Sequence, residues 1–238
     1  MKEAETPGNT CQKKGIYVVL PAYNEEKTIK DVISKLIHLG VNLIVVDDGS
    51  IDSTYHATMD LLMNHPSQIS LYRHPINRGL GATLRTGIEA AHSHGAFIIV
   101  TFDADGQHHS QDILPICQPI IHGEADVVIG KRNFSEMPFR KKFGNMVMNI
   151  ITLIFYGKDV EDSQSGLRAF NQKAAGLMEL HSRDYGVSSE IIGEVRRKNL
   201  RLVEVPITTI YTDYSLSKGT NTKVGLKILA RLIRNIFK

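Results

Sequence analysis

FIIVTFDADGQHH, residues 97–109, passes directly from an apolar run into two aspartates separated by one residue. The apolar part, Phe97–Phe102, has the composition of a buried strand, whereas aspartate is depleted in strands and costly to bury without a partner. Asp103 and Asp105 are therefore expected to face solvent, a cation or a substrate where the strand leaves the core. Oxygen ligands of this kind suit Mg²⁺ or Mn²⁺ together with substrate phosphates. The alternative is that Asp105 and Gly106 only form a turn, and this stretch alone does not decide between the two.

The composition is that of an ordinary globular protein, with one large domain or two small ones. The chain has 238 residues and a formal net charge of +3, which is too small to indicate nucleic-acid binding by itself. Its two cysteines, Cys11 and Cys117, support neither a disulfide framework nor a cysteine metal site, so a reducing, cytoplasmic compartment is expected. Residues 1–14 lack the apolar core of a signal peptide, and the longest apolar candidate, Met146–Phe155, is too short to cross a bilayer.

Short β-branched runs alternate with helical patterns along most of the chain. The strand Ile16–Leu20 is followed by the helix Glu25–Leu39, which ends at Gly40, and then by the strand Leu43–Val46. This alternation predicts an open, mostly parallel α/β sheet with helices on both faces, in which ligands bind outside the carboxyl ends of the strands. The other expected helices are 53–63, 81–91, 112–122, 143–155 and 188–197, and the other expected strands are 69–72, 96–102, 125–129 and 200–207.

Polar loops follow the first four strands. They are PAYNEE (21–26), DDGS (47–50), RHPINRG (73–79) and DADGQHH (103–109). In DDGS, Asp47 and Asp48 can bind a ribose or a base edge through charge-assisted hydrogen bonds, or the loop can simply cap the next helix. Two acidic pairs at two strand ends on one edge of the sheet favour a polar ligand bound with a cation.

Five motifs occur in the order found in one enzyme family. PAYNEE, VVDDGSIDST, NRGLGATLRTGI, FDADGQH and DSQSGLRAF closely resemble the family 2 glycosyltransferases of GT-A fold, and within them the polyprenol-phosphate sugar synthases. The resemblance runs over about residues 17–214, and it is much less specific for the sugar or the acceptor than for the family. The expected organisation is a disordered leader (1–14), a GT-A domain (15–214), and a mobile loop with a basic amphipathic C-terminal helix (215–238). The resemblance also implies metal-dependent transfer of a hexose from a UDP- or GDP-sugar to a polyprenyl phosphate.

The resemblance assigns residues to the nucleotide-sugar donor and to the metal. The implied donor-binding residues are Pro21, Tyr23, Glu25, Asp47, Asp48, Gly79, Arg85, Asp103 and Ala104. The implied metal residues are Asp103, Asp105 and Gln107, with Mg²⁺ or Mn²⁺ bridging the two phosphates of the donor. His108 and His109 are expected to belong to the loop scaffold, because hard cations bound to phosphates favour oxygen ligands.

The second half of the chain carries the residues expected at the acceptor. Cationic groups directly after the strand 125–129 can reach a phosphate. The resemblance implies that DSQSGLRAF is a loop that closes over the reacting centre, with Asp162 and Arg168 catalytic beside Asp105. The residues assigned to the acceptor or its phosphate are Lys131, Arg132, Ser165, Arg168, Ser217 and Lys218.

The need for a catalytic base depends on the acceptor. The resemblance implies inversion by a single in-line displacement. A polyprenyl phosphate is already ionised near neutral pH and needs no base, whereas a hydroxyl acceptor needs a carboxylate, with Asp162 the first candidate and Glu190 the second. Two alternatives stay open: transfer to a glycan or another hydroxyl, and a catalytically silent nucleotide-sugar-binding subunit. The intact Asp103, Asp105 and Arg168 argue against the silent subunit.

The C-terminal residues predict a basic amphipathic helix. At about 100° per residue one narrow face carries five cations and the rest is apolar. Such a helix lies either in the interface of an anionic membrane or with its apolar side against the domain. A lipid-phosphate acceptor would make peripheral contact of this helix with the cytoplasmic membrane face useful. The apolar side of another expected helix, 143–155, is expected to lie in the core. The five cations are Lys223, Lys227, Arg231, Arg234 and Lys238.

Overall fold

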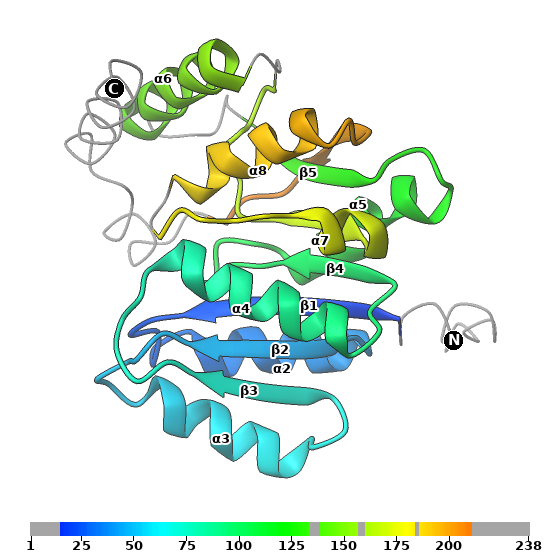
Figure 1. The fold of residues 1–238 in the computed structure, drawn as a ribbon. Helices are drawn as coiled ribbons and strands as arrows, with labels where there is room; N and C mark the ends of the chain where they lie inside the picture. Colours follow the sequence, from blue (N-terminus) through cyan, green and yellow to red (C-terminus); the bar gives the residue numbers. More distant parts are fainter. Residues whose placement is uncertain (1–14, 134–138, 157–159, 184–185, 211–238) are drawn as a thin grey trace, which may run out of the picture.

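A single mixed sheet forms the centre of the molecule (Figure 1). This computed structural model describes residues 15–133, 139–156, 160–183 and 186–210. Within these ranges the strands are β1 (Ile16–Ala22), β2 (Asn42–Asp47), β3 (Ile69–Arg73), β4 (Ile98–Thr101), β5 (Val127–Arg132), β6 (Arg168–Asn171) and β7 (Leu202–Ile207). Their order is β3-β2-β1-β4-β6-β5-β7, and only β6 runs antiparallel to its neighbours. The expected mostly parallel α/β sheet is confirmed.

Helices cover both faces of this sheet, as the alternation of strands and helices predicts. One face is covered by α2 (Ile29–Leu39), α3 (Thr54–Asn64) and α5 (Ile113–Ile121), and a one-turn 3₁₀ helix, η1 (Ser110–Asp112), precedes α5. The other face is covered by α4 (Leu80–Ser93), α7 (Gln172–Leu177) and α8 (Val187–Arg197), and α6 (Phe139–Tyr156) packs against α8. Two large apolar cores result among the described residues, one on each face, because alternate side chains of each strand point to opposite faces.

Strand β6 determines how the second half of the site is built. Its first residue, Arg168, lies opposite Thr101 of β4 and Ile129 of β5, near the points where those two parallel strands end. Because β6 is antiparallel, the residues that precede it arrive at the same edge of the sheet as the loops that follow the parallel strands. The expectation that all of DSQSGLRAF forms a loop was wrong at its end, since Arg168–Asn171 is a strand. Helix α7, which follows directly, was not predicted either.

Helix α6 exposes some of its apolar side chains. Met146, Ile150 and Leu153 are about half exposed, whereas Asn145 and Thr152 on the other side are buried. The expectation that the apolar side lies in the core was therefore wrong for these three residues. Met148 is buried, as expected, and the buried side also carries polar groups that hydrogen-bond to neighbouring segments.

The termini fall outside the described residues. The expected leader 1–14, the expected C-terminal basic helix, and Ser217 and Lys218 belong to these ranges. Within the part of the chain that the structure describes, no helix combines the length and the hydrophobicity needed to span a membrane.

Candidate active site

The loops after β1 and β2 are joined by reciprocal hydrogen bonds. The Asn24 backbone N–H donates to Ser50 Oγ (3.0 Å), and the Ile51 N–H donates back to Asn24 Oδ1 (3.0 Å). The Glu25 N–H donates to Thr54 Oγ1 at the start of α3 (2.7 Å). These bonds make PAYNEE and DDGS one rigid unit at the carboxyl edge of the sheet.

The carboxylate of Asp48 organises the loop after β3. It accepts the backbone N–H groups of Arg78 (3.0 Å) and Gly79 (2.8 Å), and it hydrogen-bonds to His74 Nδ1 (2.7 Å). The other ring nitrogen of His74 contacts Thr86 Oγ1 on α4 (3.0 Å). Asp48 is 3% exposed, so its charge is compensated inside the protein. This side chain positions Gly79, one of the residues expected at the donor.

Asp47, its neighbour, is also buried. Its Oδ2 forms an ion pair with Arg73 Nε (3.1 Å), and its Oδ1 accepts the Ser50 N–H (3.2 Å). The Arg73 guanidinium lies 4.3 Å from the centre of the Tyr55 ring, a cation–π arrangement. Among the other residues expected at the donor, Pro21 lies in β1, and Tyr23 is 41% exposed directly after it.

The loop that leads from α7 to α8 packs on the start of α4. Arg85 Nη1 donates to the Leu180 carbonyl (3.0 Å), and the Gly81 N–H donates to the Arg183 carbonyl (2.8 Å). The Glu190 carboxylate accepts the backbone N–H groups of residues 181 and 182 at 2.8 and 2.9 Å. Glu190, the second candidate base, thus holds this loop against the helix that Arg85 belongs to.

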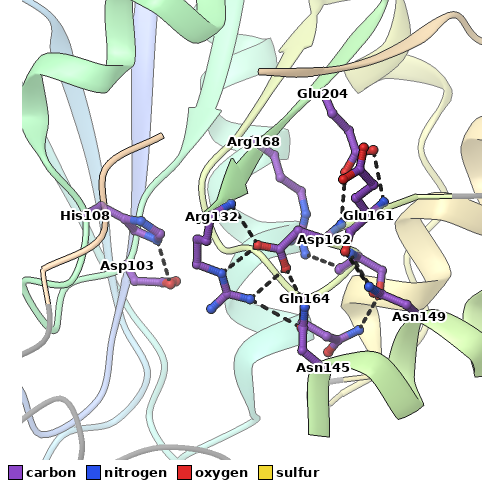
Figure 2. Close-up of polar contacts among 11 residues, drawn as sticks. Asp103, His108, Arg132, Asn145, Asn149, Glu161, Asp162, Gln164, Arg168 and Glu204 are labelled. Atoms are coloured by element: carbon purple, nitrogen blue, oxygen red, sulfur yellow. Dashed lines mark hydrogen bonds and ion pairs between the residues drawn. The ribbon is translucent and has the colours of Figure 1, made fainter. Parts of the chain in front are cut away.

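Asp103 and Asp105 lie in the turn that follows β4, with Ala104 buried between them. Asp103 Oδ2 is 2.9 Å from His108 Nε2 (Figure 2). Asp105 accepts both the backbone N–H of Gln107 (3.0 Å) and the side-chain amide of Gln107. Gln107 and His108, which follow the two carboxylates in the same motif, therefore hold them in place.

Opposing effects act on the two carboxylates. Although burial alone would raise the pKa of Asp103, its hydrogen bond to His108 and the charges of His108, Arg168 and Arg132 hold that pKa below its ordinary value. Burial and the negative charge of Asp103 raise the pKa of Asp105. A divalent cation between the two groups would relieve this repulsion.

The donor set fits a cation that is shared with phosphate. Among the described residues, no group of three or more histidine, cysteine, aspartate or glutamate side chains is placed to hold a metal by itself. Mg²⁺ typically binds through one or two carboxylates and completes its shell with substrate phosphates and water. Two carboxylates at a sheet edge with an adjacent amide, from Gln107, match that pattern.

On the other side of the site, Asp162 and Arg132 form a buried ion pair (Figure 2). Arg132 Nε and Nη2 each donate to a different oxygen of the Asp162 carboxylate at 2.7 Å, and the Arg132 backbone N–H donates at 3.1 Å. Asn145 Nδ2 on α6 adds a fourth hydrogen bond (3.1 Å). Asp162 is 0% exposed, and its carboxylate is engaged by Arg132 and Asn145 alike.

The other described residues that were expected at the acceptor are Lys131, Ser165 and Arg168. Lys131 forms an ion pair with Glu161 (2.9 Å). Ser165 is buried, and its Oγ has no hydrogen-bond partner among the described residues. Arg168 is 1% exposed; its Nη2 donates to the Ser163 carbonyl (3.2 Å). Burial lowers the pKa of Arg168 to about 10, while the negative charges of Asp103 and Asp162 act in the opposite direction.

Sequence reasoning missed several residues that build the site. His74 and Asn145 hold Asp48 and Asp162, and Glu204 of β7 accepts backbone N–H groups of the loop that carries Asp162. Signals for two of them exist: Glu204 is a lone carboxylate within an apolar strand, and Asn145 is a polar residue in an apolar helix. Their partners lie far away in sequence, so the pattern did not reveal what they contact.

This arrangement defines a class of protein. An open, mostly parallel α/β sheet with an acidic pair after β4, and with polar loops gathered at the carboxyl ends of its strands, is an architecture of GT-A type. The chain belongs to glycosyl transferase family 2, whose model matches residues 17–177, and it is a glycosyltransferase. The expected family and fold are thereby confirmed.

Named relatives and solved structures agree with this assignment. The chain is 41% identical to a UDP-N-acetylglucosamine–dolichyl-phosphate N-acetylglucosaminyltransferase from Methanococcus voltae, over 92% of this chain and 95% of the relative. It is 24% identical to a polyprenol monophosphomannose synthase from Mycolicibacterium smegmatis, over 92% of this chain and 86% of the relative. A glucosyl-3-phosphoglycerate synthase from Mycobacterium tuberculosis, solved with Mn²⁺ and UDP-glucose, shares the fold with a TM-score of 0.67 and 22% identity, over 98% of this chain and 84% of that one.

Proposed function

We propose that this glycosyltransferase moves a sugar from a nucleotide diphosphate sugar to a polyprenyl phosphate. The observation that carries the proposal is the state of the two candidate bases. The Asp162 carboxylate is committed to Arg132 and Asn145, and the Glu190 carboxylate is committed to two backbone N–H groups. A phosphate acceptor needs neither group as a base, because its oxygen is already ionised near neutral pH.

The reaction that fits is a single displacement at the anomeric carbon. An acceptor phosphate oxygen forms the new bond to that carbon as the bond to the donor's diphosphate breaks, and the nucleoside diphosphate leaves with the bonding electron pair. The Arg132 guanidinium, held by Asp162, and Lys131 supply positive charge for the acceptor phosphate. Arg168 is buried, so it contributes its charge from behind this surface.

Asp103 and Asp105, with Gln107 beside them, are the residues that would hold Mg²⁺ or Mn²⁺. Such a cation, when bound, stabilises the charge that develops on the leaving diphosphate. Asp48 acts indirectly at the donor, because its carboxylate fixes the loop that carries Gly79.

The first donor to test is UDP-N-acetylglucosamine. The support for it is the name of the 41% identical relative, which specifies both that donor and a dolichyl-phosphate acceptor. GDP-mannose is the comparison, because more distant relatives are named for mannose transfer.

The test measures lipid product and nucleotide release together. Full-length protein is mixed with Mn²⁺, labelled donor and a polyprenyl phosphate in detergent. We expect chloroform-extractable label with one nucleoside diphosphate released per sugar transferred. Chelation of the metal should abolish both signals, and added Mg²⁺ or Mn²⁺ should restore them.

Two controls define the outcome. The matching polyprenol without phosphate should give no product, and Asp105→Asn should lower kcat by on the order of 100-fold without changing the unfolding temperature. Transfer to a glycan hydroxyl but not to the polyprenyl phosphate would overturn the proposed acceptor. Binding of the nucleotide sugar without any turnover would instead support a silent subunit.

A further inference from the structure

Three consecutive backbone N–H groups at residues 161–163 donate to side chains from other elements. The Glu161 N–H donates to Glu204 Oε2 (3.0 Å), and the Asp162 N–H donates to Glu204 Oε1 (2.9 Å). The Ser163 N–H donates to Asn149 Oδ1 (3.1 Å). Figure 2 shows the side chains of Glu204 and Asn149 approaching this segment from different sides. The segment that carries Asp162 is thus fixed by side chains, with no strand or helix of its own.

Glu204 reaches this segment from within the sheet. It lies in β7 at the position that pairs with Ile129 of β5, three residues before Arg132. Glutamate is depleted in strands, and this one stands between Val203 and Val205. Its cost in the strand is offset by two charge-assisted hydrogen bonds, which are among the stronger kinds.

Asn149 completes the hold from α6. Its amide oxygen accepts the Ser163 N–H and the Ser163 hydroxyl, and its amide nitrogen donates to the Glu161 carbonyl. One turn earlier on the same helix, Asn145 donates to the Asp162 carboxylate. The backbone and the side chain of residue 162 are therefore each held from outside.

A continuous chain of contacts leads from Glu204 to Arg132. Glu204 fixes the amide of Asp162, and the Asp162 carboxylate receives two guanidinium hydrogen bonds of 2.7 Å from Arg132. A shift of the backbone at residue 162 moves this carboxylate, and Arg132 must follow it or lose its partner.

We propose that Glu204 is a positioning residue for the acceptor: it sets the guanidinium of Arg132 through the backbone of Asp162, and Asn149 holds the next amide. The proposal rests on the proposed function in one respect, namely that Arg132 binds the acceptor phosphate. Nothing in it involves the donor side of the site.

The first test compares Glu204→Gln with a matched control. The glutamine carbonyl can accept one of the two N–H groups, but its NH₂ then faces the other. We expect KM for the polyprenyl phosphate to rise by about 10-fold, which corresponds to about 1.4 kcal/mol, with KM for the donor within about two-fold. Glu179→Gln, which removes a surface carboxylate paired with Arg197 and Lys198, should change neither value. An unchanged acceptor KM, or equal rises in both KM values, would refute the positioning role.

A double-mutant cycle separates positioning from a general loss of stability. If Glu204 acts through Arg132, Glu204→Gln should add little to the acceptor KM of an Arg132→Lys variant. If the fold-changes in acceptor KM of the two single variants multiply in the double variant, the two residues act independently. If Glu204→Gln unfolds, Glu204→Asp replaces it in both measurements, because it keeps the charge on a shorter side chain.

Amide exchange tests the inference without any substrate. In the wild type, the N–H groups of residues 161 and 162 should exchange slowly, and Glu204→Gln should accelerate them by about 10-fold while peptides from β1 and α4 stay unchanged. Unchanged exchange at residues 161 and 162 would overturn the inference. Faster exchange in a protein that transfers nothing to polyprenyl phosphate would support the role of Glu204 in fixing residues 161 and 162. It would refute only the proposed acceptor.

Discussion

Gly166 lies against the Asp103 carboxylate. A methyl group added at Gly166 would stand 2.0 Å from Asp103 Oδ2, while the Gly166 carbonyl accepts a hydrogen bond from Thr101 Oγ1 (2.7 Å). The backbone is therefore anchored to β4, and the carboxylate would have to turn away. The absence of a side chain at this position is part of what orients the acidic pair.

We predict that Gly166→Ala lowers kcat by about 10- to 100-fold and raises the metal concentration needed for half-maximal activity. Metal titrations of turnover measure both effects. Gly144→Ala is the control, because nothing lies within 4 Å of the added methyl group there, and its activity should match the wild type. A Gly166→Ala enzyme with wild-type metal dependence would contradict the assigned contact.

The acidic pair could be predicted from sequence, whereas the use of several other side chains could not. Asp103 and Asp105 stand out because a strand ends at them, which is a local property. The ion pair between Asp162 and Arg132 joins residues 30 positions apart, so neither one reveals its partner. Arg168 is the sharpest example: an arginine in a loop motif suggests contact with a phosphate, but its place at the start of β6 buries it.

At the scale of elements, α4 packs unusually closely on β1. A methyl group added at Gly87 would lie 2.2 Å from Val19 Cγ1 and 3.3 Å from Val46 Cγ2. Gly87 is inside a helix, where alanine is intrinsically favoured by about 1 kcal/mol. Steric overlap with two core valines opposes that preference, and overpacking of a core costs more.

We therefore predict that Gly87→Ala lowers the free energy of unfolding by about 1–3 kcal/mol. Adding Val19→Ala should recover part of the lost free energy of unfolding, since it removes the Val19 methyl group that overlaps with the new side chain. Urea unfolding of the single and double variants measures this. A more stable Gly87→Ala variant would mean that α4 can move off the sheet at little cost.

The elements differ in how well they could be predicted. Helix α2 and strands β1, β2 and β4 follow from apolar periodicity, and their ends fell within a few residues of the expected ones. Strand β6 has only four residues, begins with arginine and ends with asparagine, so no period is visible. It exists because β4 and β5 supply partners on both sides, which is a tertiary cause.

At the scale of the whole molecule, Asp126 ties three strands together near the edge opposite the site. Its carboxylate accepts hydrogen bonds from Nε (3.1 Å) and Nη2 (3.0 Å) of Arg201, the residue before β7. It also accepts one from Nδ2 (2.9 Å) of Asn171, the last residue of β6. Although burial opposes it, the hydrogen bond to Arg201 and then the other contacts hold the pKa of Asp126 well below its usual range. A carboxyl whose pKa is depressed by folding stabilises the fold above its unfolded pKa of about 3.9.

Asp126→Asn should therefore lower the free energy of unfolding at pH 7 by about 2 kcal/mol. The difference from wild type should shrink as the pH falls below about 4, because the wild type then loses the same contribution. Urea unfolding at pH 7 and pH 3 measures it. Asp31→Asn, which removes an exposed pair with Lys35, should have little effect at either pH. An equal loss at both pH values would show that the Asp126 charge is not what matters.

The sheet order has a further consequence during translation. Residues 16–101 supply β3, β2, β1 and β4 as one contiguous group, and residues 127–207 supply β6, β5 and β7. A ribosome thus releases β1 to β4 first, with β4 as an open edge and Asp103 without the arginines that later offset its charge. We expect the nascent chain to depend on β6 to close that edge, so a ribosome stalled shortly before Arg168 should expose it to chaperones or to aggregation.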